Sequence, residues 1–227
     1  MSGTAVVVGG TGGIGAPIVS AFAGLGWNVA VVTRGRKPLD FHGNDRSVTV
    51  FTGDVSKQDD MQRIGREFST VHGRADCLIY ASGIPPDVTV GLREYAVENW
   101  DATFNTYVRG FLLSFQTMLP NMNRDGHIVA LGSAITRFSS DCLPPIQAGH
   151  YAAAKAALAE LVKWARREAR EREVKVSLVS PGAVDTAVHR SGELASISKK
   201  LLPVKVVCDA VLCLVSHGVE ADLQMVL

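Results

Sequence analysis

Five glycines within seven residues, placed between a strand-like and a helix-like segment, constrain the fold more than any other feature of the sequence. The short β-branched run Thr4–Val8 predicts a buried strand, and residues 16–25 follow a helical pattern. The intervening stretch, Gly-Gly-Thr-Gly-Gly-Ile-Gly at 9–15, lets the backbone turn tightly and approach a phosphate group, which the first amides of the helix can then bind. A merely tight loop is the alternative, but it requires fewer glycines. The stretch therefore predicts a nucleotide-binding strand–turn–helix unit.

Strands and helices alternate along the rest of the chain. This alternation predicts an α/β fold with a doubly wound parallel sheet (a Rossmann fold) of about seven strands, with helices on both faces. No linker, repeat or low-complexity stretch interrupts it, so residues 1–227 are expected to form a single domain. Beyond the first unit, the expected strands are 28–33, 47–52, 76–80, 127–131, 174–179 and 223–226, and the expected helices are about 59–68, 94–118, 151–171 and 204–216.

Composition and charge exclude several classes of function. Hydrophobic residues make up 47% of the 227 residues and charged residues 20%, and the net charge is only +1, so we expect neither nucleic-acid nor membrane binding. No apolar run approaches the ~18 residues of a membrane span, and we see no signal peptide, so a cytoplasmic protein is expected. The cysteines show no metal-ligand spacing, and no metal site is predicted: Cys77, Cys142, Cys208 and Cys213.

A tyrosine and a lysine four residues apart suggest acid–base chemistry. Tyr151 and Lys155 lie in an alanine-rich helical pattern, where residues four apart share a face. The ammonium group is expected to favour the phenolate and to lower the pKa of Tyr151, which would make it a general acid near neutral pH. The same spacing occurs on many solvated helix faces, so the glycine turn and Ser133 upstream strengthen the interpretation.

Basic residues follow the second predicted strand. In dinucleotide-binding folds an acidic residue about 20 positions beyond the glycines holds a ribose hydroxyl, whereas an arginine there accommodates a 2′-phosphate. Here Arg34 follows the strand, Arg36 and Lys37 come next, and no acid precedes Asp40. These residues favour NADP(H) over NAD, with a solvated basic turn as the alternative.

Taken together, the motifs resemble the classical short-chain dehydrogenase/reductase family over residues 4 to about 186. The glycine pattern of that family falls on Gly9, Gly13 and Gly15, with a valine in place of its leading threonine. Ser133 and the Tyr-x-x-x-Lys pair follow in order, and the stretch Pro-Gly-Ala-Val-Asp-Thr at 181–186 is similar to the family's Pro-Gly-x-Val-x-Thr. The order of three separate elements carries the resemblance.

The resemblance implies hydride transfer between NADP(H) and a carbonyl carbon. Tyr151 would protonate the carbonyl oxygen, Ser133 would hydrogen-bond the same oxygen, and Lys155 would hold the nicotinamide ribose. The expected small-molecule substrate is a ketone of β-ketoacyl or polyketide type, either free or linked to a carrier protein or to coenzyme A. The alternative function is a catalytically weak NADP-binding sensor or scaffold. The cofactor-binding residues implied by the family pattern are Gly9, Thr11, Gly12, Gly13, Ile14, Gly15, Arg34, Asp54, Val55, Ala81, Gly83, Tyr151, Lys155, Pro181, Gly182, Val184 and Thr186.

The chain departs from the family pattern in two of its motifs. The family's Asn-Asn-Ala-Gly falls on Tyr-Ala-Ser-Gly at 80–83, and its catalytic asparagine position falls on Tyr107. Asn105 is two residues away from Tyr107. On a regular helix, this separation places its side chain on the opposite face, so it could take the same place only if the helix bulges there. We therefore hypothesise that Tyr107 or bulk solvent resupplies the proton that the family passes through a water relay at the asparagine.

Other departures concern loops and surfaces. The segment at about 136–150 is longer than in the family and, with 187–202, is expected to form the substrate loops. A homodimer or homotetramer is expected, although the chain lacks the family's usual glycine-ended extension. Four arginines on one predicted helix could dock a carrier protein or could form a plain solvated face: Arg166, Arg167, Arg170 and Arg172.

Overall fold

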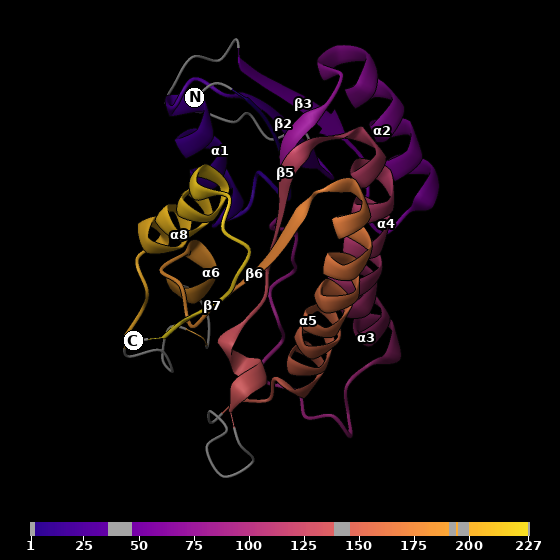
Figure 1. Ribbon diagram of the computed structural model, residues 1–227. Helices are drawn as coiled ribbons and strands as arrows, with labels where there is room; N and C mark the ends of the chain where they lie inside the picture. Colours follow the sequence, from indigo (N-terminus) through magenta and orange to yellow (C-terminus); the bar gives the residue numbers. More distant parts are fainter. Residues whose placement is uncertain (1–2, 36–46, 139–145, 191–193, 195–199, 227) are drawn as a thin grey trace.

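A computed structural model describes residues 3–35, 47–138, 146–190, 194 and 200–226. The described residues form one seven-stranded sheet with every neighbouring pair parallel, in the order β3-β2-β1-β4-β5-β6-β7 (Figure 1). The predicted doubly wound parallel sheet is confirmed. Its strands are β1 (Thr4–Val8), β2 (Asn28–Thr33), β3 (Val48–Thr52), β4 (Ala75–Tyr80), β5 (Met122–Leu131), β6 (Lys175–Pro181) and β7 (Asp222–Met225).

Helices cover both faces of the sheet, as the alternating sequence predicted (Figure 1). Helices α1 (Gly15–Gly24) and α8 (Val204–His217) lie on one face, where Val7 packs with Phe22 and Val211. Helices α2 (Gln58–His72), α4 (Gly110–Met118) and α5 (Gly149–Ala169) lie on the other, where Val6 packs in the cluster that contains Leu158. Successive β1 residues thus enter opposite cores, because strand side chains alternate between faces. The short elements are α3 (Val97–Phe104), η3 (Leu119–Asn121), η4 (Ala134–Arg137), η6 (Arg170–Arg172) and α6 (Ala187–Arg190).

The helix predicted over 94–118 is interrupted by a wider turn. Residues Asn105–Arg109 form a π-helix, η2, between α3 and α4. The amide of Gly110 donates to the carbonyl of Asn105 rather than to that of Thr106, and the freed Thr106 carbonyl accepts a hydrogen bond from the Tyr80 hydroxyl. A side chain at Gly110 would lie 2.4 Å from that hydroxyl. The buried tyrosine of β4 therefore accompanies the change in helical pitch, which propensity along the helix does not signal.

Strand β5 begins at Met122, five positions before the predicted start. Met122 pairs with Ala75, and the register then shifts before Cys77 pairs with His127. Asp125, with a φ of 61°, lies within this irregular part. The polar residues around the bulge hide the early half of the strand from a pattern-based prediction.

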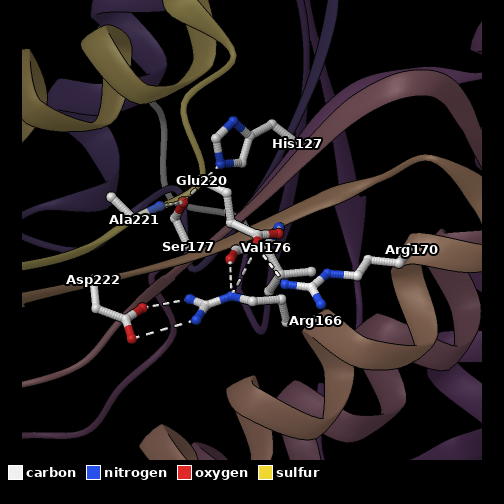
Figure 2. A network of polar contacts seen from close by, with 8 residues as sticks. All are labelled: His127, Arg166, Arg170, Val176, Ser177, Glu220, Ala221 and Asp222. Atoms are coloured by element: carbon white, nitrogen blue, oxygen red, sulfur yellow. Dashed lines mark hydrogen bonds and ion pairs between the residues drawn. The ribbon is translucent and has the colours of Figure 1, made fainter.

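Side chains hold the last strand against the rest of the sheet. Arg166 of α5 donates to the Val176 carbonyl at 2.8 Å and forms ion pairs with Glu220 and Asp222 (Figure 2). Arg170 of η6, which directly follows α5, pairs with Glu220 at 3.4 Å. Half of the arginines considered for carrier docking are therefore engaged with acids of their own chain.

Several predicted features fall wholly or partly outside the described residues. Arg36 and Lys37 lie there, as do parts of both predicted substrate loops. Of the second loop, α6 is described, and Leu202 forms a parallel bridge with Val184. Within the described ranges, no helix is both long and apolar enough to cross a bilayer.

Candidate active site

A cavity of about 530 Å³ opens at the carboxyl ends of the central strands. Because all strands are parallel, the loops that follow β1, β4, β5 and β6 meet at this edge of the sheet. Residues predicted for the cofactor and for catalysis therefore come together from distant parts of the sequence. Those lining the cavity are Gly9, Thr11, Gly12, Gly13, Ile14, Arg34, Val55, Ala81, Gly83, Tyr151, Lys155, Pro181, Gly182, Val184 and Thr186.

Close backbone approach explains the glycine turn. Gly9 has a φ of +79°, and a Cβ there would lie 2.6 Å from the Cα of Ser82. A Cβ at Gly15 would lie 2.2 Å from the Gly9 carbonyl oxygen, so this glycine lets α1 start directly against the turn without lining the cavity. The first turn of α1 contains no acidic side chain. Gly12, Gly13 and Ile14 line the cavity directly before α1, so the positive end of this helix dipole lies beside it, which suits a pyrophosphate group.

Gly13 makes a second close approach, to the loop after β6. A Cβ at Gly13 would lie 2.9 Å from the Thr186 Cβ, so a side chain here would occupy the space between the glycine turn and the loop after β6. The Thr186 hydroxyl oxygen lies 3.4 Å from the Nδ1 atom of His189. This part of the cavity is therefore built from residues more than 170 positions apart in the sequence.

Arg34 lines the cavity at the end of β2 and is exposed. Beside it the hydroxyls of Thr11 and Thr33 are 3.0 Å apart. Asp54, predicted to contact the cofactor, does not line the cavity; its carboxylate accepts hydrogen bonds from the amide and hydroxyl of Ser56. Burial by itself would raise the pKa of Asp54, but these hydrogen bonds and the charge of Arg34 keep it below its usual value. Asp54 and Val55 were both expected to contact the cofactor, but of the two it is Val55 that lines the cavity.

Tyr151 and Lys155 both line the cavity from the first turns of α5, as their spacing predicted. The Lys155 side chain is buried, and its Nζ donates to the Leu131 carbonyl at 2.8 Å. Ser133 follows β5 and is also buried; its Oγ accepts from the Ile135 amide at 3.3 Å and hydrogen-bonds the Tyr151 side chain. Ser133 does not line the cavity directly. It reaches the site through Tyr151.

The expected effect of Lys155 on Tyr151 is wrong for the protein alone. Burial raises the pKa of Tyr151, and the hydrogen bond from Ser133 opposes this only in part. Burial also lowers the pKa of Lys155 to about 7, because leaving water disfavours the charged form of either group. The Lys155 Nζ lies 5.7 Å from the centre of the Tyr151 ring but 4.1 Å from that of Tyr107. The lysine therefore lies closer to the ring of Tyr107 than to that of Tyr151.

Tyr107, which the sequence analysis placed at the family's asparagine position, lines the cavity. It lies in the π-helix η2, and its hydroxyl donates to the Ile84 carbonyl at 2.8 Å. The helix does bulge at this point, but Asn105 remains half-buried and does not line the cavity. Val188 and His189, within the predicted substrate segment 187–202, line the cavity from α6. Other lining residues that were not predicted lie at or just after the strand ends, where the carboxyl-edge rule could have pointed to them: Ser82, Ile84, Pro85, Pro86, Leu131 and Gly132.

The family model described as short chain dehydrogenase matches residues 3–195. The chain belongs to the short chain dehydrogenase family. The resemblance seen in the glycine turn, the serine and the tyrosine–lysine pair is thereby confirmed, and with it a place among the oxidoreductases of this family, which bind nicotinamide cofactors. The residue roles implied by the family pattern remain predictions.

Relatives and solved structures of short chain dehydrogenases agree with this assignment. An uncharacterized oxidoreductase of Staphylococcus haemolyticus is 24% identical over 98% of this chain and 94% of its own length, and one of Staphylococcus aureus is 29% identical over 81% and 79%. A short-chain dehydrogenase/reductase from Serratia marcescens shares the fold with a TM-score of 0.87 at 26% identity, covering 98% of this chain and 96% of its own. A short chain dehydrogenase from Burkholderia cenocepacia in complex with NADP has a TM-score of 0.85 at 22% identity, covering 97% and 95%.

Proposed function

We propose that this short chain dehydrogenase is an NADPH-dependent carbonyl reductase that converts a ketone to an alcohol. The observation that carries the proposal is one cavity lined at the same time by the glycine turn, by Arg34, and by Tyr151 and Lys155. Neither part alone would suggest a reductase, because glycine turns bind many nucleotides and tyrosine–lysine pairs occur on solvated helices. Their meeting in one cavity supports a reaction between a bound dinucleotide and a small carbonyl compound.

Arg34 and its neighbours support NADPH rather than NADH. The guanidinium group can form paired hydrogen bonds with a phosphate, and the hydroxyls of Thr11 and Thr33 lie beside the same wall. The Asp54 carboxylate accepts hydrogen bonds from Ser56 and does not line the cavity. A structural relative from Burkholderia cenocepacia was solved with NADP, which agrees with this choice without deciding it.

Bound NADPH would supply the hydride to the carbonyl carbon, and the residues of the chain would handle the proton. Because burial raises the pKa of Tyr151, its hydroxyl is protonated at neutral pH and can donate to the carbonyl oxygen. Ser133, already hydrogen-bonded to Tyr151, can stabilise the phenolate that remains. Lys155 has N–H donors beyond the one used by the Leu131 carbonyl, and these can hold ribose hydroxyls.

The apolar residues of the cavity favour an apolar carbonyl compound. Among them are Ile84, Pro85, Pro86 and Val188. A β-ketoacyl or polyketide-like ketone fits such a cavity and remains our proposal for the substrate class. Since two of the four candidate docking arginines pair with acids of the same chain, we favour a free or coenzyme A-linked substrate over one on a carrier protein.

A homo-oligomer also remains a proposal. Leu112 on α4 and Trp164 on α5 are exposed apolar side chains on neighbouring helices of one face. Burying them against a second copy would remove apolar surface from water. Size-exclusion chromatography with light scattering would measure the assembly directly.

The proposed activity is tested by NADPH oxidation with a panel of ketones. Wild type is expected to oxidise NADPH with at least one of them. Tyr151→Phe is expected to lose this activity by a factor of at least about 100, while its NADPH affinity, measured by fluorescence titration, stays within about threefold. NADPH binding without turnover on any ketone would instead favour the alternative, a cofactor-binding sensor or scaffold.

The choice of cofactor is tested separately with Arg34→Ser. Loss of a charged hydrogen bond to a phosphate is expected to weaken NADPH binding about 10- to 100-fold. NADH affinity, measured by the same titration, should change little. Equal losses for both cofactors would contradict recognition of a 2′-phosphate by Arg34.

A further inference from the structure

We propose that Tyr107 is a positioning residue for Lys155, and that the face of its ring, not its hydroxyl, performs this role. The proposal rests on the proposed function in that it concerns the lysine of the same site. It replaces the hypothesis that Tyr107 relays a proton. Three observations on the hydroxyl, the ring and the lysine's donors carry it.

The hydroxyl of Tyr107 is engaged away from the lysine. It donates its single proton to the Ile84 carbonyl at 2.8 Å, and a side chain at Gly83 would lie only 2.9 Å from its oxygen. The side chain is 4% exposed, and burial raises its pKa, so the phenol stays neutral. A relay through this hydroxyl would first have to break the bond to the loop after β4. The hydroxyl therefore anchors the ring to the cavity wall.

The ring faces the ammonium group. The Lys155 Nζ lies 4.1 Å from the ring centre, well within the range of a cation–π contact. The rings of Tyr107 and Tyr151 meet edge to face, with centroids 5.5 Å apart and planes at 77°. The π-helix η2 presents Tyr107 at this point, and its hydroxyl is fixed at the far end. The Lys155 ammonium therefore lies beside two aromatic rings and closer to that of Tyr107.

The Tyr107 ring limits the directions in which the Lys155 ammonium can donate hydrogen bonds. The ammonium has three N–H groups; one donates to the Leu131 carbonyl at 2.8 Å, and one side of the group is covered by the Tyr107 ring. The remaining donor capacity is directed toward the cavity that Lys155 lines. The ring thus sets the direction in which the lysine can hold a ribose hydroxyl.

The ring also matters for the charge of the lysine. Among the ion pairs of the described residues none includes Lys155, and its ammonium group meets the rings of Tyr107 and Tyr151 and the Leu131 carbonyl. Burial lowers the pKa of Lys155 to about 7. Near neutrality, a contact that favours the ammonium form changes the charged fraction directly.

The test compares Tyr107→Leu with Tyr107→Phe. In protein labelled with ¹³C-lysine, the pH titration of the Lys155 Cε resonance is followed by NMR and assigned by its loss in Lys155→Arg. Losing the ring should move the midpoint down by about 0.4 to 1.5 pH units in Tyr107→Leu, from the strength of cation–π contacts. Tyr107→Phe retains the ring and should keep the midpoint within about 0.2 units. The alkaline limit of NADPH binding should shift in parallel.

Phe111→Leu is the matched control, because Phe111 is fully buried in the same layer but is not among the residues that contact Lys155. An equal shift in this variant would mean general loosening of the core and would overturn the proposal. So would an unmoved midpoint in Tyr107→Leu, or equal shifts in the leucine and phenylalanine variants. The titration needs no substrate, so a wild type that binds NADPH but reduces no ketone would refute the proposed reductase and leave this test intact.

Discussion

His127 is expected to make the protein less stable as the pH falls below neutrality. The imidazole is 2% exposed, and its Nε2 atom lies 2.9 Å from the Ser177 hydroxyl, which accepts a hydrogen bond from the Ala221 amide (Figure 2). Burial, with a contribution from the Lys175 ammonium, lowers the pKa of His127 to about 4. An unfolded histidine titrates at about 6.5. The unfolded chain therefore binds a proton over a pH range in which the folded chain does not.

The sign and size of the effect follow from this difference. Because the folded pKa is the lower one, the stabilisation is fully present above about pH 6.5 and is lost as the pH falls toward 4. A difference of about 2.5 units corresponds to about 3 kcal/mol in total, at about 1.4 kcal/mol per unit. Between pH 7.5 and 5.0 the loss attributable to His127 is about 2 kcal/mol.

Guanidinium unfolding at pH 7.5 and 5.0 measures this loss in wild type and in His127→Gln. The glutamine can still hydrogen-bond Ser177 but does not titrate, so its free energy of unfolding should fall by about 2 kcal/mol less between the two pH values. Other histidines contribute equally to both proteins and cancel. Ser177→Ala serves as the control, because it loses a hydrogen bond yet keeps the titrating ring. The same pH dependence in wild type and His127→Gln would refute the reasoning.

Two further predictions concern the glycine turn and the arginines Arg166 and Arg170. Gly15→Ala is expected to abolish NADPH binding in a fluorescence titration, because its Cβ would lie 2.2 Å from the Gly9 carbonyl oxygen, whereas Gly24→Ala in the same helix meets no atom within 4 Å and should bind normally; equal binding by both would contradict the close approach. Arg166→Gln should lower the free energy of unfolding by about 1–3 kcal/mol, because its side chain is 19% exposed and also holds a backbone carbonyl of β6. Arg170→Gln should lower the free energy of unfolding by less than about 1 kcal/mol, because the Arg170 side chain is 69% exposed. Similar urea midpoints for the two variants would contradict a larger contribution from Arg166.

Much of the fold and part of the candidate site were predictable because they depend on local patterns. The strand–glycine–helix unit, the remaining strands and the common face of Tyr151 and Lys155 follow from residue spacing along single elements. The parallel sheet then brings the strand ends to one edge, so a cavity at that edge could be expected. Pattern reasoning was less reliable where a neighbouring element changed the local geometry, as at the early start of β5 beside the shifted register of β4.

The order of the elements, the positions of the glycines and the common face of Tyr151 and Lys155 could be inferred from the chain alone, because each depends on residues close together in it. The protonation and contacts of these side chains depend on how the chain folds. Burial raises the pKa of Tyr151 against the expected influence of Lys155, and the wider helical turn beside Tyr80 presents Tyr107 to the cavity while Asn105 stays outside it. Desolvation and contacts between distant elements arise from packing, which no single stretch of the sequence contains.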